Sequence, residues 1–205
     1  MTYSYQLYAI TNDRANHDLS LVEEALKGGV TILQYRDKVN ANIETANKLK
    51  QLCKKYDVPL IINDDLSILL EVNADGIHVG QDDLNAAEVK QKIEKDQLLG
   101  VSCHNLSEAL KAEADGADYI GVGALFDTQT KTDTLHTSVN ELVKICQNVS
   151  IPVVGIGGIN HDNITELMGS GIDGVCISSG IFNHNNPKEA SELFKHDSSQ
   201  ILGGL

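Results

Sequence analysis

Short apolar runs alternate with longer stretches of helical periodicity over nearly the whole chain. The runs of strand type are rich in Val, Ile, Leu and Tyr and lie at residues 5–11, 30–36, 59–63, 76–80, 98–103, 119–125, 152–158 and 174–180. Several are apolar at consecutive positions, as is typical of parallel strands that are covered on both faces. In the intervening stretches apolar residues recur three and four positions apart, which predicts helices at 19–27, 42–54, 85–95, 107–114, 139–147 and 163–169.

Repeated strand–helix–strand connections require a parallel sheet with right-handed crossovers. Eight such units in 205 residues predict an α/β protein with one domain, residues 1–205, folded as a compact (β/α)8 TIM barrel. A doubly wound open sheet is the alternative, but it typically has a Gly-rich turn after the first strand, where this chain reads TNDRAN (11–16). The last residues, about 196–205, are predicted to be a loose tail.

The chain is strongly acidic, with 16 Lys and Arg against 29 Asp and Glu and a formal net charge of -13. Such a charge repels polyanions, which argues against nucleic-acid or anionic-membrane partners. The sequence has no apolar run of bilayer length and begins without the features of a secretion signal, so we predict a cytoplasmic protein. The four cysteines are far apart and are predicted to be reduced. Whether the protein forms a homo-oligomer stays open.

Polar and charged residues gather where the predicted strands end. In a barrel of this kind the active site lies at the C-terminal ends of the strands. These ends hold Gln34, Arg36, Lys38, Asn63, Asp64, Asp83, Ser102, His104, Thr128, Thr130, Lys131, Ser178 and Ser179, together with a Gly-rich turn at 155–158. The strand ends therefore form the candidate functional site.

Each of these features also has a purely structural explanation. Asp64 and Asp83 stand where Asp often caps a helix, and the turn at 155–158 holds glycines that any sharp bend of the backbone requires. His78 lies inside an apolar strand and is interpreted as a structural histidine. The same kind of explanation, a solvated loop residue or a satisfied hydroxyl, applies to Arg36, Lys38, Ser102 and His104.

Taken together, the strand-end residues suit two phosphate sites. Asp64 and Asp83 follow consecutive strands and can share one Mg2+ ion, which typically binds one or two carboxylates, phosphate oxygens and water. Arg36, Lys38 and Lys131 can surround the same phosphates. The ends of the seventh and eighth strands, rich in Gly and Ser, can bind a second phosphate through backbone N–H groups. Two such sites imply two phosphorylated substrates.

At these residues, and over nearly its whole length, the chain resembles the thiamine phosphate synthase family. The matching stretches are QYRDK (34–38), INDD (62–65), ADGIHVGQDDL (74–84), GVSCH (100–104), GADYIGVG (116–123), TQTK (128–131), VVGIGGI (153–159) and DGVCISS (173–179). Members of this family join 4-amino-2-methyl-5-hydroxymethylpyrimidine diphosphate to 4-methyl-5-(2-phosphoethyl)thiazole and release pyrophosphate. The resemblance implies a transferase of thiamine biosynthesis with Mg2+ as its cofactor and small phosphorylated molecules as its partners.

The resemblance also assigns roles to individual residues. Gln34 is expected to hold the pyrimidine, and Ser102 to hydrogen-bond the pyrimidine or the departing diphosphate. Arg36 and Lys131 are expected to act with Ser102 as catalytic groups on the diphosphate. The other implied contacts are to the diphosphate from Lys38 and Asn63, to Mg2+ from Asp64 and Asp83, and to the thiazole phosphate from Thr128, Thr130, Gly158, Ser178 and Ser179.

The reaction that the resemblance implies needs no protein nucleophile. The amino group of the pyrimidine supports positive charge as the C–O bond breaks, so the step is expected to be dissociative. The protein then has to stabilise the leaving diphosphate with preorganised charge and to hold the thiazole nitrogen nearby. The sequence agrees with this, because it holds no convincing Ser-His-Asp or Cys-His constellation.

Two other functions stay open. The stretch SSGIF (178–182) is similar to thiazole tautomerases, a related subgroup that isomerises a thiazole phosphate carboxylate without a metal, although the catalytic His of that subgroup falls at Ala124 here. The other function is a barrel that binds thiazole or thiamine phosphate without turnover. Ala124, Asp127 and the segment 135–139 depart from the synthase pattern, which usually has Gly-Pro after the sixth strand.

Overall fold

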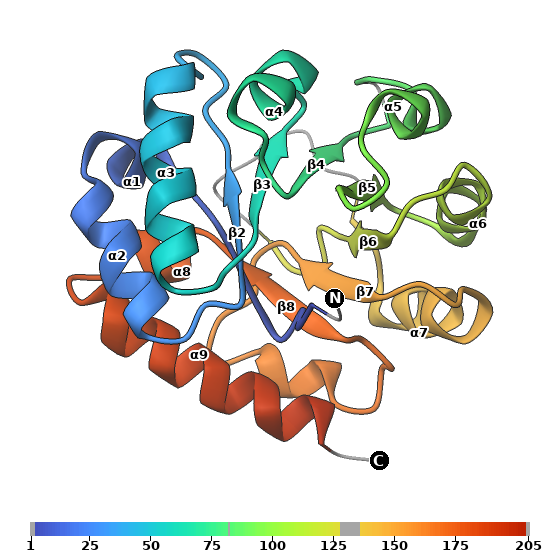
Figure 1. The fold of residues 1–205 in the computed structure, drawn as a ribbon. Helices are drawn as coiled ribbons and strands as arrows, with labels where there is room; N and C mark the ends of the chain where they lie inside the picture. The colour runs from blue at the N-terminus through green and yellow to red at the C-terminus, as the bar shows by residue number, and fades with distance from the viewer. Residues whose placement is uncertain (1–2, 82, 128–135, 204–205) are drawn as a thin grey trace.

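The structure is a computed structural model and describes residues 3–81, 83–127 and 136–203. Parallel strands form a closed barrel, and helices surround it on the outside (Figure 1). The strands are β1 (Leu7–Ile10), β2 (Ile32–Tyr35), β3 (Leu60–Asn63), β4 (Gly76–Val79), β5 (Leu98–Cys103), β6 (Tyr119–Val122), β7 (Val153–Ile156) and β8 (Gly174–Ile177). The helices are α1 (Asp13–His17), α2 (Leu19–Lys27), α3 (Ile43–Lys55), α4 (Leu66–Val72), α5 (Ala86–Lys92), α6 (Leu106–Ala114), α7 (Val139–Asn148), the 3-10 helix η1 (Ile164–Leu167), α8 (Ser179–Phe182) and α9 (Pro187–Leu202).

Each strand pairs with its neighbours in the sequence, and the barrel closes because β1 pairs with both β2 and β8. Tyr8 lies opposite Ile32 on one side and opposite Cys176 on the other. All of these pairings are parallel. The predicted (β/α)8 TIM barrel is therefore confirmed.

Short polar side chains begin most of the helices. Each accepts a hydrogen bond from a backbone N–H of the first helical turn, the role in which Asn, Asp and Ser are most favourable. The capping residues are Asn12 (α1), Asp18 (α2), Asn42 (α3), Asp65 (α4), Asn85 (α5), Asn105 (α6), Ser138 (α7) and Asn186 (α9). These caps fix where the loops at the C-terminal end of the barrel stop.

Two segments differ from the sequence-based expectation for physical reasons. The apolar run 152–158 forms a strand only to Ile156, because Gly157 and Gly158 have φ angles of 96° and 65° and turn the chain out of the sheet. The helix expected at 163–169 is only the short η1. Left-handed glycines follow η1 and prevent the helix from continuing.

The C-terminal segment is wrongly predicted as a loose tail. Helix α9 continues well beyond residue 196 and buries Ser198 and Ile201. It lies beside α2 in the ring of helices (Figure 1). The backbone of Gly28, at the end of α2, approaches α9 so closely that a Cβ there would lie 2.3 Å from the carbonyl oxygen of Lys188. The last helix is thus an integral part of the barrel.

The apolar core has two parts. The larger part fills the space between the strands and the helices. The smaller part lies inside the barrel and consists of Tyr5, Tyr8, Ile10, Ile32, Ile61, Tyr119, Val154 and Cys176. Side chains alternate along a strand, so the inward positions continue from this inner cluster towards the strand ends. Buried tyrosine hydroxyls usually find a hydrogen-bond partner, and the hydroxyls of Tyr8 and Tyr119 are hydrogen-bonded to residues near the candidate site.

In the part of the chain that the structure describes, no helix has both the length and the apolar character that crossing a membrane requires. Each of the four cysteines is free, and Cys53, Cys103 and Cys176 are buried. The structure therefore agrees with the prediction that the cysteines are reduced.

Candidate active site

Polar side chains from three strands lie at the C-terminal end of the barrel. Gln34 is the third residue of β2 and is 2% exposed. Asn63 ends β3, and Ser102 is the residue before the last of β5; both are partly exposed. Three of the predicted positions thus share the end at which parallel barrels place their active sites.

Asp64 and Asp83 form an acidic pair at this end. Asp64 follows β3 in the left-handed conformation, with a φ of 61°, and its N–H donates to the carbonyl oxygen of His78 at 2.9 Å. Burial, the negative charge of Asp83 and a hydrogen bond between the two carboxyl groups raise the pKa of Asp64. The amide of Asn63 donates to Asp64, and the N–H of Gly80 donates to Asp83 at 3.0 Å. Two carboxylates held this close favour a shared cation or proton.

Neither of these carboxylates caps a helix. Helix α4 is capped by Asp65, whose side chain accepts hydrogen bonds from two backbone N–H groups at 2.9 and 3.0 Å. Helix α5 is capped by Asn85. The structural explanation of Asp64 and Asp83 as helix caps is therefore wrong, and both remain available to a ligand.

Arg36 and Lys38 bring positive charge to the same strand end. Thr11 accepts the N–H of Arg36 at 3.0 Å, and the amide of Asn16 donates to the Arg36 carbonyl oxygen, also at 3.0 Å. Among residues 3–81, 83–127 and 136–203, neither cation is in an ion pair. Burial is the main cause of the raised pKa of Asp64, and the charge of Lys38 opposes it. Lys38 thus acts on the acidic pair without forming a salt bridge to a described residue.

The loop between β6 and α7 carries further predicted contacts. Three of them, Thr128, Thr130 and Lys131, lie outside the described residues. Beyond this loop, Thr137 donates its N–H to the carbonyl oxygen of Ala124 and its hydroxyl to that of His104, both at 2.9 Å. The ring of His104 is 2.9 Å from Glu108. His104 is therefore a structural loop residue, and Thr137 anchors the part of the segment 135–139 that the structure describes.

The ends of β7 and β8 are neighbours in the barrel. A Cβ at Gly158 would lie 2.4 Å from the carbonyl oxygen of Asp127, so this turn requires glycine. Ser178 precedes α8 without capping it through its side chain, and Ser179 is the first residue of that helix. The explanation of 155–158 as a tight turn is confirmed for Gly157 and Gly158, whereas Gly155 and Ile156 belong to β7. The binding of a phosphate by Gly158, Ser178 and Ser179 stays a prediction.

A chain of hydrogen bonds crosses the inside of the barrel from β2 to β5. The amide nitrogen of Gln34 donates to the Tyr8 hydroxyl at 2.8 Å. The hydroxyls of Tyr8 and Tyr119 are 2.8 Å apart, and that of Tyr119 is 3.1 Å from Nδ1 of His78. Nε2 of His78 is 3.0 Å from the hydroxyl of Ser102. Burial raises the pKa of both tyrosines far above its usual range, so both hydroxyls keep their protons.

The sequence does not predict three members of this hydrogen-bond chain. It indicates only a structural role for His78, and it indicates no role for Tyr8 or Tyr119. The available signal is a set of polar tips at inward positions of β1, β4 and β6. A second signal is the glycine at two inward positions nearby. A Cβ at Gly100 would lie 2.4 Å from Nδ1 of His78, and one at Gly121 would lie 3.3 Å from its Cε1. The barrel therefore leaves space for the ring of His78.

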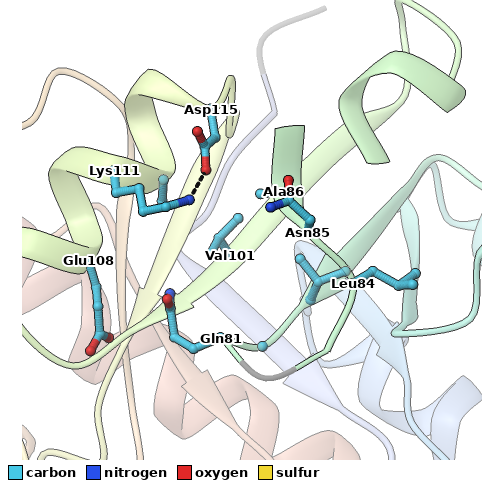
Figure 2. A pocket seen from close by; sticks show the side chains of 11 residues that line it. Gln81, Leu84, Asn85, Ala86, Val101, Glu108, Lys111 and Asp115 are labelled. Carbon is cyan, nitrogen blue, oxygen red and sulfur yellow. Dashed lines mark hydrogen bonds and ion pairs between the residues drawn. The ribbon is translucent and has the colours of Figure 1, made fainter. Parts of the chain in front are cut away.

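A separate pocket lies between α5 and α6, outside the barrel, and is shown in Figure 2. Gln81 and Leu84 line it from one side, and Glu108 and Lys111 from the other. Its volume of about 60 Å³ is far below the roughly 300 to 1,000 Å³ of ordinary ligand sites. Lys111 is also paired with Asp115 (Figure 2). This pocket does not suit a phosphorylated substrate.

Comparison with known proteins agrees with this arrangement. The sequence profile of the family described as "Thiamine monophosphate synthase" matches residues 7–181. The chain belongs to the thiamine monophosphate synthase family. The "Thiamine-phosphate synthase" of Alkaliphilus oremlandii is 49% identical over 200 residues, which cover 95% of this chain and 96% of that protein. The one from Methanobrevibacter smithii is 46% identical over 191 residues, 91% of each chain.

Solved structures share this barrel. The thiamine phosphate pyrophosphorylase from Pyrococcus furiosus superposes with a TM-score of 0.88 at 35% identity, covering 97% of this chain and 98% of that one. More distant barrels, such as the (S)-3-O-geranylgeranylglyceryl phosphate synthase from Thermoplasma acidophilum with a TM-score of 0.72 at 16% identity, share the fold alone. The relatives named from the thiamine monophosphate synthase family are synthases, which favours that activity over the tautomerase suggested by SSGIF (178–182).

Proposed function

We propose that this chain is a thiamine phosphate synthase, which joins 4-amino-2-methyl-5-hydroxymethylpyrimidine diphosphate to 4-methyl-5-(2-phosphoethyl)thiazole and releases pyrophosphate. One observation carries the proposal. Within the described residues, the cations Arg36 and Lys38 form no ion pair and the carboxylates Asp64 and Asp83 cap no helix, and the charge of Lys38 acts on Asp64. All four follow strand ends of a member of the thiamine monophosphate synthase family.

In this function the diphosphate binds on the side of β2, β3 and β5. Arg36 offers a planar fork of N–H donors to two phosphate oxygens, and Lys38 adds a mobile point charge. Asn63 and Ser102 can each donate a hydrogen bond to the same group. Gln34, held by Tyr8 inside the barrel, presents its remaining amide atoms to the pyrimidine.

Asp64 and Asp83 suit one Mg2+ ion. Mg2+ in phosphate sites usually binds one or two carboxylates and takes its other ligands from phosphates and water. Burial and the charge of Asp83 raise the pKa of Asp64, and a cation between the two carboxylates relieves their repulsion. When bound, Mg2+ would neutralise charge on the diphosphate.

The protein's own part in the reaction is electrostatic and positional. The C–O bond of the pyrimidine breaks with its electron pair passing to the diphosphate, and the thiazole nitrogen then forms the C–N bond. Burial raises the pKa of Cys53, Cys103 and Cys146 to about 12, so these thiols are not available as thiolates at neutral pH. Preorganised donors and the exclusion of water account for the rate instead.

The thiazole phosphate is proposed to bind at the ends of β7 and β8. The contacts expected there are the backbone at Gly158 and the hydroxyls of Ser178 and Ser179, with Thr128, Thr130 and Lys131 from the loop after β6. The left-handed turn at Gly158 suits this role, because phosphate sites of barrels bind through backbone N–H groups at such turns.

The decisive assay is pyrophosphate release by the purified protein. The pyrimidine diphosphate is supplied with and without the thiazole phosphate, at controlled Mg2+, and thiamine phosphate is identified by mass. We expect product only when both substrates and Mg2+ are present. Saturable binding of the thiazole phosphate without any product would instead favour the non-catalytic or tautomerase alternatives and would direct attention to Ala124 and the segment 135–139.

We also propose that the enzyme works in the cytoplasm. Its four cysteines are free, as is usual in a reducing compartment. Whether it forms a homo-oligomer stays a prediction, and sedimentation of the purified chain tests it directly.

A further inference from the structure

The buried chain from Gln34 to Ser102 has a direction in which every buried proton finds an acceptor. An amide nitrogen only donates, so the oxygen of Tyr8 accepts from Gln34. The proton of Tyr8 then goes to Tyr119, and that of Tyr119 to Nδ1 of His78. Tyr8 is 2% exposed and Tyr119 is 0% exposed. A proton pointing elsewhere would therefore be buried without a partner, which folded proteins avoid.

The direction of this hydrogen-bond chain determines where the protons of His78 and Ser102 lie. A His78 ring that accepts at Nδ1 carries its proton on Nε2 and donates it to the hydroxyl of Ser102. Ser102 then keeps its own proton for another partner. A diphosphate offers only acceptors, so a hydroxyl that faces it has to donate. The direction set at Gln34 and the demand of the substrate at Ser102 therefore agree.

We propose that Tyr8, Tyr119 and His78 are positioning residues that hold Ser102 as a hydrogen-bond donor towards the departing diphosphate. The proposal deepens the proposed function and rests on it. The same hydrogen-bond chain joins the residue assigned to the pyrimidine, Gln34, to the residue assigned to the diphosphate, Ser102. Its direction leaves the amide oxygen of Gln34 to accept a hydrogen bond from the amino group of the pyrimidine.

The barrel is built to keep the middle of this chain in place. Gly100 lies opposite Tyr119 in the β5–β6 ladder, and Gly121 lies opposite Ser102. A Cβ at Gly100 would lie 2.2 Å from Cζ of Tyr119. The ring of Tyr119 packs at 5.5 Å from that of His78 and at 5.9 Å from that of Tyr8, between centroids. The rings thus have little freedom to leave their hydrogen bonds.

The opposite direction would have a different chemical meaning. If the Gln34 amide presented its oxygen to Tyr8, each proton would reverse, and Nε2 of His78 would accept from Ser102. Ser102 and His78 would then resemble a nucleophile and its base, a pair that a dissociative reaction does not use. The position of the proton on His78 therefore separates the two arrangements.

The first test reads this proton directly. The histidine ring nitrogens are labelled with 15N, and the free protein is studied by NMR at neutral pH, with His78→Gln used to assign the signal among the seven histidines. We expect a protonated Nε2 and an unprotonated Nδ1 on His78. A proton on Nδ1 would overturn the proposal. Because no substrate is present, this result does not depend on whether the protein makes thiamine phosphate.

The second test breaks the chain without touching the substrate. Tyr119→Phe keeps the ring and removes the hydroxyl between Tyr8 and His78. Loss of a direct donor to a transition state commonly lowers kcat by about 100-fold or more, so loosening such a donor through its support should lower kcat by about tenfold with little change in either KM. The Nε2–H signal of His78 should also give way to a mixture of both tautomers.

Tyr5→Phe is the matched control. The ring of Tyr5 packs against Tyr119 with centroids 5.2 Å apart, but its hydroxyl takes no part in the four bonds of the chain, so kcat and the His78 signal should not change. Tyr8→Phe supplies a second break if Tyr119→Phe fails to fold. The positioning role would be refuted if kcat were unchanged in a correctly folded Tyr119→Phe or Tyr8→Phe variant. It would also be refuted if Tyr5→Phe lost as much kcat as these variants.

Discussion

Gly100 is the position where a single added methyl group tests both the packing of the barrel and the site above it. In Gly100→Ala the new Cβ would lie 2.2 Å from Cζ of Tyr119 and 2.4 Å from both its hydroxyl oxygen and Nδ1 of His78. Ordinary carbon contacts are at about 3.5 Å, so the Tyr119 ring has to move by about 1 Å. That ring is fully buried and cannot move into solvent.

The expected cost follows from these contacts. Overpacking a core typically costs about 1 to 3 kcal/mol, and each of the two hydrogen bonds made by Tyr119 contributes about 1 kcal/mol. We therefore expect Gly100→Ala to lower the free energy of unfolding by about 3 to 5 kcal/mol, a large part of the roughly 5 to 15 kcal/mol of an ordinary domain. Turnover should fall as well, because a displaced His78 no longer holds Ser102.

Urea unfolding followed by circular dichroism measures the change, and Gly121→Ala is the control. The Cβ of Gly121→Ala would lie 3.3 Å from His78, and neither glycine has a positive φ. The loss in the control should stay below about 1 kcal/mol, because Gly→Ala also reduces the entropy of the unfolded chain. Equal stability and equal turnover of the two variants would refute the reasoning.

Three further predictions concern the metal, the thiazole phosphate and the last helix. Asp83→Asn should greatly reduce turnover at limiting Mg2+ without loss of thermal stability. The control Asp65→Asn, which keeps a capping side chain, should leave the Mg2+ dependence of turnover unchanged. Loss of folding in Asp83→Asn would contradict the role of Asp83 as a metal ligand. Ser179→Ala should raise the KM for the thiazole phosphate more than that for the pyrimidine diphosphate, and equal changes in steady-state kinetics would argue against the assignment. Ile201→Ala should lower the free energy of unfolding by about 2 kcal/mol, measured by urea unfolding, whereas Leu193→Ala on the exposed face of α9 should change it by less than about 0.5 kcal/mol.

The fold could be predicted because its signal is local and repeated. A buried parallel strand needs an apolar run, and a helix needs apolar residues at its own spacing. Both requirements recur around the barrel, so an error at one element does not alter the architecture. The error at residues 196–202 shows the limit of this signal. Helix α9 buries only part of one face, and its short polar residues, such as Ser198, resemble those of a loop until the contact with α2 is known.

The strand-end residues of the site could also be predicted, since parallel strands bring their C-terminal ends together whatever their exact register. The roles of adjacent residues are harder to separate. Asp64 and Asp65 are the same residue type, and the cap is Asp65 only because Asp64 has the left-handed conformation that turns its carboxylate towards Asp83. No property of the isolated side chains distinguishes them.

The chain between Gln34 and Ser102 shows what periodicity leaves out. Its members lie on β1, β2, β4, β5 and β6, and each looks like an ordinary strand residue in its own segment. Their contact depends on the register that sets Gly100 opposite Tyr119 and Gly121 opposite Ser102, because glycine at these inward positions gives the two rings their space. A buried tyrosine or histidine in a barrel strand is therefore best interpreted from the residues that lie opposite it. Where these are glycines and polar side chains, the tyrosine or histidine belongs to a hydrogen-bond network. Its substitution is then expected to affect the site that this network contacts.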